Sequence, residues 1–495
     1  MQTADTALPT GKHFALTWGI PDNYGGMTAA MLHRSRAFVR LGGVEVDVLT
    51  VDDRPDYPQI EAELRASGAL IDGMRLRNVW DDLRAEPPAA QEARIAPVEL
   101  LVPEEGDRVA RDGDVVLLRE RRRADGSFLA ADRFRRDGTL LATDRLVTGT
   151  RRIVVHGPDG APLRQWGSTW KLFRWWLDRL IGADPGYIIV DSKTAARFVA
   201  GYRRAAVVTV HVVHGGHRMN DVPGSVRESR EFALRRAGDY DGLVVLTARQ
   251  RGELLADGFG AAARIAVIPN GVSLDAPSAE EHVRGQGVVL ASLTARKRIA
   301  HAVRAAALAG GSDPAVTLDV YGEGEQEGLV RAEIDAADAG ERIRLRGFDP
   351  RARKAFATAD FSLLTSTTEG LPLVLAEAMA AGCLPIAYDI RYGPADLIVD
   401  GETGYLVPEG DVDAMAARIL DLQRLSPEEV AGMRAAARAR AQEFSDEAVT
   451  RRWGDELRAA SAAKGRNEQR AAKAVARTGW VASAIRRRLR RVLGR

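Results

Sequence analysis

The chain has 495 residues, 45% of them hydrophobic and 28% charged, and this ordinary balance excludes wholesale disorder and allows two or three domains. Its formal net charge of +2 hides an asymmetry, because residues 464–495 hold eleven basic side chains against one acid, a net +10, which leaves −8 for residues 1–463. An acidic body in which aromatic residues do not interleave with basic ones argues against nucleic acid as a partner.

Three features of the sequence indicate the cellular compartment of the protein. Cys383 is the single cysteine, so an internal disulfide cannot form and a reducing compartment is favoured. The start, MQTADTALPTGKHFALTWG, lacks a charged segment followed by an apolar run, and we expect no secretory signal. No stretch reaches the roughly 18 apolar residues that a membrane helix requires. We therefore expect a cytoplasmic protein.

The first predicted unit, HFALTWGIPDNYGGMTAAMLHRSRAFVRLGGVEVDVLTV, reads as a strand, a glycine turn, an amphipathic helix and a second strand. This order is typical of one half of a doubly wound α/β sheet. From about residue 98 the pattern changes, since Asp-Gly pairs at Asp112, Asp125, Asp137 and Asp159 separate short alternating runs. Such pairs are strong hairpin signals, so we predict an inserted antiparallel meander.

Strand–helix alternation returns with GYIIVDSKTAARFV and AAVVTVHVVHGGH, and a second series begins with GVVLASL after the polar stretch SLDAPSAEEHVRGQG, which we interpret as a linker. Two α/β halves place the expected ligand cleft between them. The predicted division is an N-terminal Rossmann-like acceptor domain over 1–97 and 181–280, the meander over 98–180, a C-terminal Rossmann-like nucleotide-sugar domain over 285–430, C-terminal helices over 431–463 and a basic tail over 464–495.

The basic tail ends in VASAIRRRLRRVLGR, where Ile485, Leu489 and Val492 fall on one helical face among arginines. One interpretation is docking on an anionic membrane surface, which would make the protein peripheral on the inner face of the cell membrane. The other is a solvated terminal helix.

The stretch TSTTEGLPLVLAEAMAAGCLPIAY holds the most specific chemistry. It reads as a turn, a helix with Pro372 at its first position and Gly382 just past its end, and a strand. A helix start attracts phosphate, whereas Glu369 and Glu377 would repel phosphate and accept hydrogen bonds from hydroxyls. A nucleotide sugar combines an anionic centre with hydroxyl groups on both sides. The alternative is that Glu369 only shapes the turn and Glu377 is a solvated helix position.

EGLPLVLAEAMAAG resembles the paired-glutamate signature of the retaining glycosyltransferases of family 4, whose GT-B architecture sets two Rossmann-like domains face to face. NYGGM, IPNGV, the Lys-Arg pair at a helix start, VYGEGEQ and RLRGF follow in the order of that family. The resemblance covers roughly residues 12–460. Within the family, YGPADLIVDGETGYLV and the meander are most similar to bacterial enzymes that α-glycosylate wall teichoic acid or serine-rich surface proteins.

The resemblance implies roles for individual residues. Glu377 would hold the ribose hydroxyls, Glu369 the hydroxyls of the donor sugar, and His214 would face that sugar from the N-terminal domain. Lys297 would neutralise the diphosphate. The implied catalytic residues are thus Glu369, His214 and Lys297, and the implied donor-binding residues are Gly25, Gly26, Arg296, Arg298, Gly370, Leu371, Pro372, Leu373, Val374 and Glu377.

Two positions complicate this assignment. The family usually has an arginine where this chain has Ser292, so either Arg296 or Arg298 compensates or phosphate binding is weaker. HVVHGGH clusters His211, His214 and His217, and a metal site is one alternative. No cysteine or second ligand cluster accompanies them, so we expect no metal and no cofactor. His211 is then a structural strand residue, and His217 points toward the acceptor.

The resemblance implies transfer of a hexose or N-acetylhexosamine, with retention, from a UDP-linked sugar to a polyanionic or lipid-linked envelope acceptor such as a polyol-phosphate teichoic acid. The alternatives are O-glycosylation of serine-rich surface proteins, a non-catalytic GT-B partner subunit, and epimerisation of a nucleotide sugar, whose extra acids and bases are not evident. RERRR and RFRR in the meander either attract a polyanionic acceptor or lie on solvated strand faces. A homo-oligomer formed through the meander is a further expectation from the resemblance.

Overall fold

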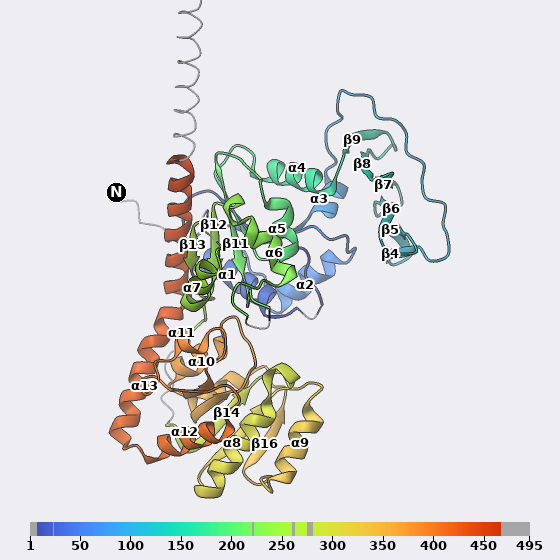
Figure 1. Cartoon of the computed structure of the whole chain (residues 1–495). Helices are drawn as coiled ribbons and strands as arrows, with labels where there is room; N and C mark the ends of the chain where they lie inside the picture. The colour runs from blue at the N-terminus through green and yellow to red at the C-terminus, as the bar shows by residue number, and fades with distance from the viewer. Residues whose placement is uncertain (1–6, 23, 220–221, 260–262, 275–280, 467–495) are drawn as a thin grey trace, which may run out of the picture.

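The computed structural model describes residues 7–22, 24–219, 222–259, 263–274 and 281–466. Within these ranges the strands form two parallel sheets and one antiparallel sheet. Figure 1 shows two α/β domains, one above the other, and the antiparallel sheet projecting from the side of the upper domain. The two predicted Rossmann-like domains and the inserted meander are thereby confirmed.

The N-terminal domain, the upper one in Figure 1, is built on a parallel sheet. Its elements are β1 (Lys12–Leu16), α1 (Gly26–Gly42), β2 (Val46–Thr50), α2 (Tyr57–Ala66), β3 (Met74–Asn78), α3 (Val79–Ala85), α4 (Thr169–Ile181), β10 (Gly186–Val190), α5 (Lys193–Val199), β11 (Val207–Val213), α6 (Glu228–Arg235), η1 (Ala237–Asp239), β12 (Gly242–Val245), α7 (Ala248–Ala256) and β13 (Ile265–Val267). The strand order is β13-β12-β11-β10-β1-β2-β3. Because the order reverses at β1, a ligand crevice is expected beyond the carboxyl ends of β1 and β10.

Both faces of this sheet are covered. Ala15 of β1 belongs to one buried cluster, whereas its neighbours Phe14 and Leu16 belong to a second. Successive side chains of a strand point to opposite faces, so each face of the sheet packs against its own layer of helices. This double burial explains why strands such as β10, which is buried at all five residues, are apolar along their whole length.

The C-terminal domain repeats this plan, with the sheet order β16-β15-β14-β17-β18-β19. Its elements are β14 (Val283–Leu290), η2 (Ala295–Lys297), α8 (Ile299–Ser312), β15 (Thr317–Tyr321), α9 (Glu327–Ala336), β16 (Ile343–Gly347), η3 (Ala352–Ala357), β17 (Ala359–Leu364), α10 (Leu373–Ala381), β18 (Leu384–Tyr388), α11 (Pro394–Leu397), β19 (Tyr405–Val407), α12 (Val412–Arg424), α13 (Pro427–Ala441) and η4 (Gln442–Phe444). The order reverses between β14 and β17, so the η2 turn and the loop before α10 lie next to each other. The predicted linker is shorter than expected, since its last residues already form β14.

The insertion is a meander in which consecutive strands pair antiparallel. Its strands are β4 (Arg108–Asp112), β5 (Val115–Arg122), β6 (Phe128–Phe134), β7 (Leu140–Val147), β8 (Thr150–His156) and β9 (Pro162–Trp166). Each predicted Asp-Gly pair lies at a hairpin turn or at a strand end. At one of them, Gly138 has a φ of 81°, and Asp137 accepts a hydrogen bond from the amide of Thr139.

The predicted end of the insertion at residue 180 is wrong. The antiparallel sheet ends with β9 at Trp166, and α4 packs on the parallel sheet of the N-terminal domain. Leu172, Phe173, Trp176 and Leu177 recur at helical spacing and are buried there. The prediction missed this pattern because the preceding hairpins extended the β reading too far.

A helix over residues 446–466 leaves the C-terminal domain and returns to the N-terminal one, where Figure 1 shows it running along the side of the sheet. Arg264 forms an ion pair of 2.7 Å with Glu456, and Lys464 one of 3.0 Å with Asp241. Lys464 is buried, so it is a structural cation and not, as predicted, the start of a basic tail. The rest of that tail and its predicted membrane contact lie outside the described residues.

Candidate active site

Two adjoining cavities lie at the edge where the domains face each other. The first, the interdomain cavity of about 510 Å³, is lined by both domains, including Gly26 and His214 on one side and Lys297 and Glu369 on the other. The second, the C-domain cavity of about 690 Å³, is lined by the C-terminal domain alone. Leu290, Leu373 and Val374 line both, so one elongated ligand could occupy the two together.

Glu369 lies in the loop between β17 and α10, at the wall of the interdomain cavity. Its Oε1 atom accepts hydrogen bonds from Lys297 Nζ at 2.6 Å, Arg296 Nη1 at 3.0 Å and Ser366 Oγ at 2.7 Å. The Glu369 side chain is only 12% exposed. The predicted sugar-binding carboxylate and the predicted phosphate-binding lysine thus form one ionic cluster.

The cations come from η2, which precedes α8. Arg296 and Lys297 line the interdomain cavity, but Arg298 lines neither cavity, and we do not assign it to donor binding as the sequence suggested. Its φ of 46° turns the chain into the left-handed region, and its guanidinium donates to the carbonyls of Thr365 and Ser366. Arg298 therefore holds the start of the Glu369 loop.

Glu377 lies on α10 and lines the C-domain cavity, where its Oε2 atom is 2.9 Å from Nε of Arg353. Ser292, which replaces the arginine expected at that position, lines the same cavity. The two glutamates of the signature thus belong to different cavities. The helix between them carries its positive end toward the place where the cavities meet.

The start of α10 differs by one residue from the prediction. Pro372 occupies the N-cap position and the helix begins at Leu373, while Gly382 ends it as predicted, with a φ of 85°. Proline has no N–H, so Pro372, which was predicted to bind the donor, cannot do so through a backbone amide. The amides of Gly370, Leu371, Leu373 and Val374 remain available on residues that line the interdomain cavity.

The N-terminal domain contributes the turn before α1. Gly25 is the N-cap of α1, and Gly26 lines the interdomain cavity. A Cβ atom added to either glycine would meet no protein atom within 4 Å. The packing of the protein itself therefore does not require glycine at these two positions, which leaves space for a ligand to approach the backbone.

His214 follows β11 and is held by a buried charge network. Its Nε2 atom is 2.7 Å from Oδ1 of Asp191, and Arg34 donates to both carboxylate oxygens of Asp191, at 2.9 and 2.7 Å. Burial would raise the pKa of Asp191, but Arg34 and His214 lower it to about 2. Sequence reasoning missed Arg34 and Asp191, although an aspartate directly after β10, at the reversal of strand order, is a usable signal.

The other two histidines do not join His214 at a common site. His211 Nδ1 lies 2.9 Å from the carbonyl oxygen of Val190, and burial lowers its pKa to about 4, as suits the structural role expected for it. His217 is fully buried and does not point toward an open acceptor site as predicted. It lies 3.1 Å from Asp257 and 3.2 Å from the hydroxyl of Tyr392, a residue of the opposite domain.

Tyr392 joins the two domains beside the site. Its hydroxyl donates to Glu253 Oε2 at 2.5 Å, and its backbone amide donates to the carbonyl of Glu369 at 3.1 Å. Tyr392 is 1% exposed. The orientation of the Glu369 loop is therefore tied to the N-terminal domain through one tyrosine, a link that no local sequence pattern revealed.

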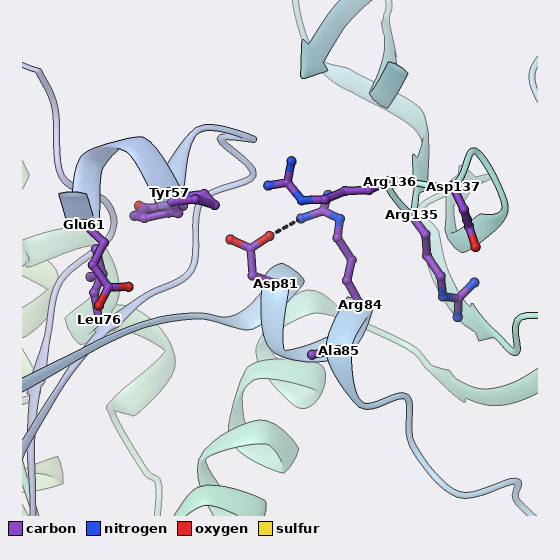
Figure 2. Close-up of a pocket in the computed structure, with 10 residues that line it drawn as sticks. Tyr57, Glu61, Leu76, Asp81, Arg84, Ala85, Arg135, Arg136 and Asp137 are labelled. Carbon is purple, nitrogen blue, oxygen red and sulfur yellow. Dashed lines mark hydrogen bonds and ion pairs between the residues drawn. The ribbon is translucent and has the colours of Figure 1, made fainter. Parts of the chain in front are cut away.

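A third cavity, of about 590 Å³, separates the N-terminal domain from the insertion (Figure 2). Three arginines and three acids line it, and Asp81 pairs with Arg84 at 2.7 Å. Most arginines of the meander runs that were predicted to attract a polyanion or to be solvated also have acidic partners, such as Asp107 for Arg121, whereas Arg123 and Arg135 donate to backbone carbonyls. Opposite charges offset one another in this region, which gives no reason to place an anionic acceptor here.

Comparison with known proteins shows which family the C-terminal domain is similar to. Residues 281–441 match the family model described as glycosyl transferases group 1. The chain is 29% identical over 250 residues to the poly(ribitol-phosphate) alpha-N-acetylglucosaminyltransferase of Staphylococcus aureus strain COL, which covers 49% of each protein. It is also 29% identical over 256 residues to the GtfA subunit of the UDP-N-acetylglucosamine–peptide N-acetylglucosaminyltransferase of Streptococcus gordonii, covering 50% of each.

Another relative is an exopolysaccharide phosphotransferase of Streptomyces coelicolor, 33% identical over 239 residues, which are 48% of this chain and 24% of that protein. The matched segments thus span about half the length of these curated relatives or less. The family match covers residues 281–441, so it shows that the C-terminal domain is similar to glycosyl transferases group 1.

Solved structures resemble almost the whole chain. A mutant of S. aureus TarM, crystallised with fondaparinux, alpha-GlcNAc-glycerol and UDP, superposes with a TM-score of 0.72 at 20% identity, over 90% of this chain and 99% of TarM. The GtfA/B complex gives a TM-score of 0.67 at 21% identity, over 91% and 100% of the two chains. These likenesses confirm the predicted GT-B fold. Among the described residues, the helices are too short or too polar to cross a membrane.

Proposed function

We propose that the protein is a retaining glycosyltransferase that moves a hexose or N-acetylhexosamine from a UDP-linked sugar to a polyol-phosphate acceptor of the cell envelope. The observation that carries this proposal is the cluster of Glu369, Lys297 and Arg296 in the wall of the interdomain cavity. A carboxylate for hydroxyls, cations for a diphosphate and a helix start between them match the parts of a nucleotide sugar. Relatives that act on polyol phosphates support the choice of acceptor.

In this proposal the nucleoside occupies the C-domain cavity, and Glu377 exchanges its contact with Arg353 for the ribose hydroxyls. The diphosphate lies across the start of α10, where Lys297 and Arg296 turn from Glu369 toward it. Released from these cations, Glu369 accepts hydrogen bonds from the sugar, which lies in the interdomain cavity opposite His214. The network of Asp191 and Arg34 keeps the His214 ring in one orientation.

Transfer then breaks the bond between the anomeric carbon and the diphosphate oxygen. The acceptor hydroxyl forms its bond to the same face of that carbon, and its proton passes to the departing phosphate oxygen. Lys297 and Arg296 stabilise the charge that develops on the leaving diphosphate. Positioning of the sugar by Glu369 and His214 supplies most of the remaining rate enhancement. No protein nucleophile is needed in this scheme.

The test measures UDP released from UDP-glucose, UDP-galactose and their N-acetylated forms, with and without a synthetic trimer of glycerol phosphate. We expect release to rise when the trimer is added, and NMR of the product to show an α-linkage from an α-linked donor. A β-linkage would exclude retention while leaving transfer intact. Absence of release with every donor would exclude the proposal.

A non-catalytic partner subunit is the second candidate, and Ser292 favours it, because a cation expected near the diphosphate is absent from that position. The GtfA relative is itself a subunit, and one similar structure is the GtfA/B complex. The same assay separates the two candidates, since a partner subunit releases no UDP on its own. Replacing Ser292 with arginine distinguishes them further, because it would strengthen donor binding only in a chain that binds the donor.

A further inference from the structure

Two arginines of the N-terminal domain line the interdomain cavity and have no role in the scheme above. Arg227 is the N-cap residue of α6, and Arg230 lies in its first turn. They face the cavity from the side opposite Lys297 and Arg296. The interdomain cavity therefore has a basic wall on each domain.

Both arginines are anchored through their inner nitrogens. Arg230 Nε donates to the carbonyl of Gly216 at 3.1 Å, and Arg227 Nε donates to the carbonyl of Arg218 at 2.8 Å. The glycines of the same loop let the guanidinium groups lie close to the loop backbone. A Cβ on Gly215 would lie 3.3 Å from Nη2 of Arg230. Anchoring at Nε fixes each group while leaving its outer nitrogens for another partner.

Neither arginine forms an ion pair with a carboxylate of the described residues, in contrast to their neighbours. Arg218 pairs with Asp257 at 2.7 Å, and Arg235, on the same helix α6, pairs with Glu231 at 2.7 Å. Burial and the nearby charge of Arg227 lower the pKa of Arg230 to about 10, which still leaves it charged at neutral pH. A partly buried cation without a counter-charge is costly, and an anionic ligand would offset that cost.

The position of these arginines indicates which part of a ligand they meet. Gly370, the residue after Glu369, lies against the loop that anchors them, since a Cβ on Gly370 would be 3.4 Å from the carbonyl oxygen of His214 and 3.6 Å from Cα of Gly215. Glu369 and His214 are the residues assigned to the sugar. An anion at Arg227 and Arg230 would therefore lie beside the sugar, on the N-terminal domain, and apart from the diphosphate held by Lys297.

We propose that Arg227 and Arg230 form a second anion subsite, which binds a phosphodiester of the acceptor next to the hydroxyl that receives the sugar. This inference rests on the proposed function, and it explains how an acceptor with few features besides phosphates and hydroxyls is positioned for attack. A guanidinium offers paired donors that match two oxygens of a phosphate group. Two guanidinium groups on one wall of the cavity select acceptors whose phosphate lies at a fixed distance from the hydroxyl that receives the sugar.

The first experiment measures binding to the full chain saturated with UDP, which fills the diphosphate site. A trimer of glycerol phosphate is titrated at low salt, with glycerol as the neutral control. We expect Arg230→Gln and Arg227→Gln each to weaken binding of the trimer by about tenfold or more. Arg235→Gln, on the same helix but paired outside the cavity, should bind as the unaltered protein does. Equal binding by all variants would overturn the proposal.

The second experiment uses steady-state transfer. Arg230→Gln should raise the KM for the trimer about tenfold, and Arg230→Lys, which retains the charge, should restore part of the loss. A parallel loss of UDP affinity would instead assign Arg230 to the diphosphate. If Arg230→Gln binds UDP-glucuronate more weakly than the unaltered protein does, while its binding of the trimer is unchanged, Arg230 would be assigned to an anionic donor sugar. Either result overturns the acceptor subsite.

Failure of the proposed function has a separate signature. If the unaltered chain does not bind UDP, the transferase proposal fails, and the trimer is then titrated without UDP. Loss of that binding in Arg227→Gln, whose exposed side chain makes misfolding less of a concern than at Arg230, would still support the anion subsite. Thermal unfolding of each variant identifies any that has lost its fold.

Discussion

Lys297 Nζ lies 2.6 Å from Glu369 Oε1, so the cation assigned to the diphosphate and the carboxylate assigned to the sugar are bound to each other in this structure. Each group neutralises the other at a position that is largely buried. In the proposed scheme donor binding separates them, because the donor supplies a phosphate for the lysine and hydroxyl groups for the glutamate. Until the donor binds, the ion pair holds both side chains at the wall of the interdomain cavity.

This relationship predicts different behaviour for two variants. Glu369→Gln removes the charge that competes for Lys297, so UDP affinity should stay the same or rise while transfer falls by ~10² to 10³. Lys297→Ala should lose both transfer and UDP affinity. Calorimetry with UDP and the release assay measure the two effects. Weaker UDP binding in Glu369→Gln would show that the ion pair does not compete with the diphosphate.

Asp191 should be important for both stability and transfer. Asp191→Asn leaves the buried Arg34 without its counter-charge, and we expect a loss of about 3 to 5 kcal/mol in the free energy of unfolding, measured with urea. His214→Ala retains the Arg34 pair and should cost less stability while still reducing transfer. Similar stability losses in the two variants would contradict the assigned roles.

The acid dependence of Asp191 has a defined sign. Its pKa of about 2 lies below the ordinary value of 3.8, so its contribution to stability is complete above about pH 4 and is lost as the pH falls toward 2. Asp191→Asn should therefore lose sensitivity to pH in that window. A stability profile unchanged in shape between pH 4 and 2 would argue against the ionised pair.

His211 should make the protein sensitive to milder acid. Burial lowers its pKa to about 4 from 6.5, so the unfolded chain binds a proton below pH 6.5 that the folded chain binds only near pH 4. Stability should fall as the pH is lowered through this window, by at most on the order of 3 kcal/mol from this group. His211→Asn, which can still donate to Val190, should lose less stability between pH 7 and 4.5. An equal loss in both proteins would contradict this.

Tyr392 should couple the domains to the Glu369 loop. Tyr392→Phe removes only the hydroxyl that bonds to Glu253 and leaves the backbone bond to Glu369. We expect a stability loss of about 1 to 3 kcal/mol and a higher KM for the donor, because the loop is held less firmly. A double-mutant cycle with Glu253→Gln measures the coupling. Independent effects of the two changes would show that the contact does not link the domains.

The order of strands and helices could be predicted from the sequence because local patterns encode it. The helix of α10 and its Gly382 end were visible for the same reason, and so was the spacing of Glu369 and Glu377. The end of the insertion was misplaced because the helical spacing within α4 was overlooked, whereas the errors at the site depended on packing between distant segments. Arg298 was misassigned because its left-handed backbone directs it to the Thr365 loop, a geometry that its sequence neighbours do not signal.

The network around His214 was missed for a similar reason. Arg34 and Asp191 are 157 residues apart, and only the strand order brings them together. His217 was expected to face the acceptor, but Tyr392 of the other domain covers it. Contacts between domains leave no periodic pattern in a single sequence, so they required the folded chain.

The helix over residues 446–466 also lies beside the first residues of the described chain. Gly454 passes so close to the carbonyl of Ala7 that a Cβ there would lie 1.7 Å from that oxygen, and Phe38 packs on Trp453 with ring centroids 6.2 Å apart. Residue 466 lies twelve helical residues beyond Gly454, roughly 18 Å, so a linker long enough to span that distance back to residue 7, with new ends opened between the two domains, would give a circular permutant. In that permutant the terminal helix and the N-terminal domain would form one uninterrupted stretch, which the native order of the chain does not permit.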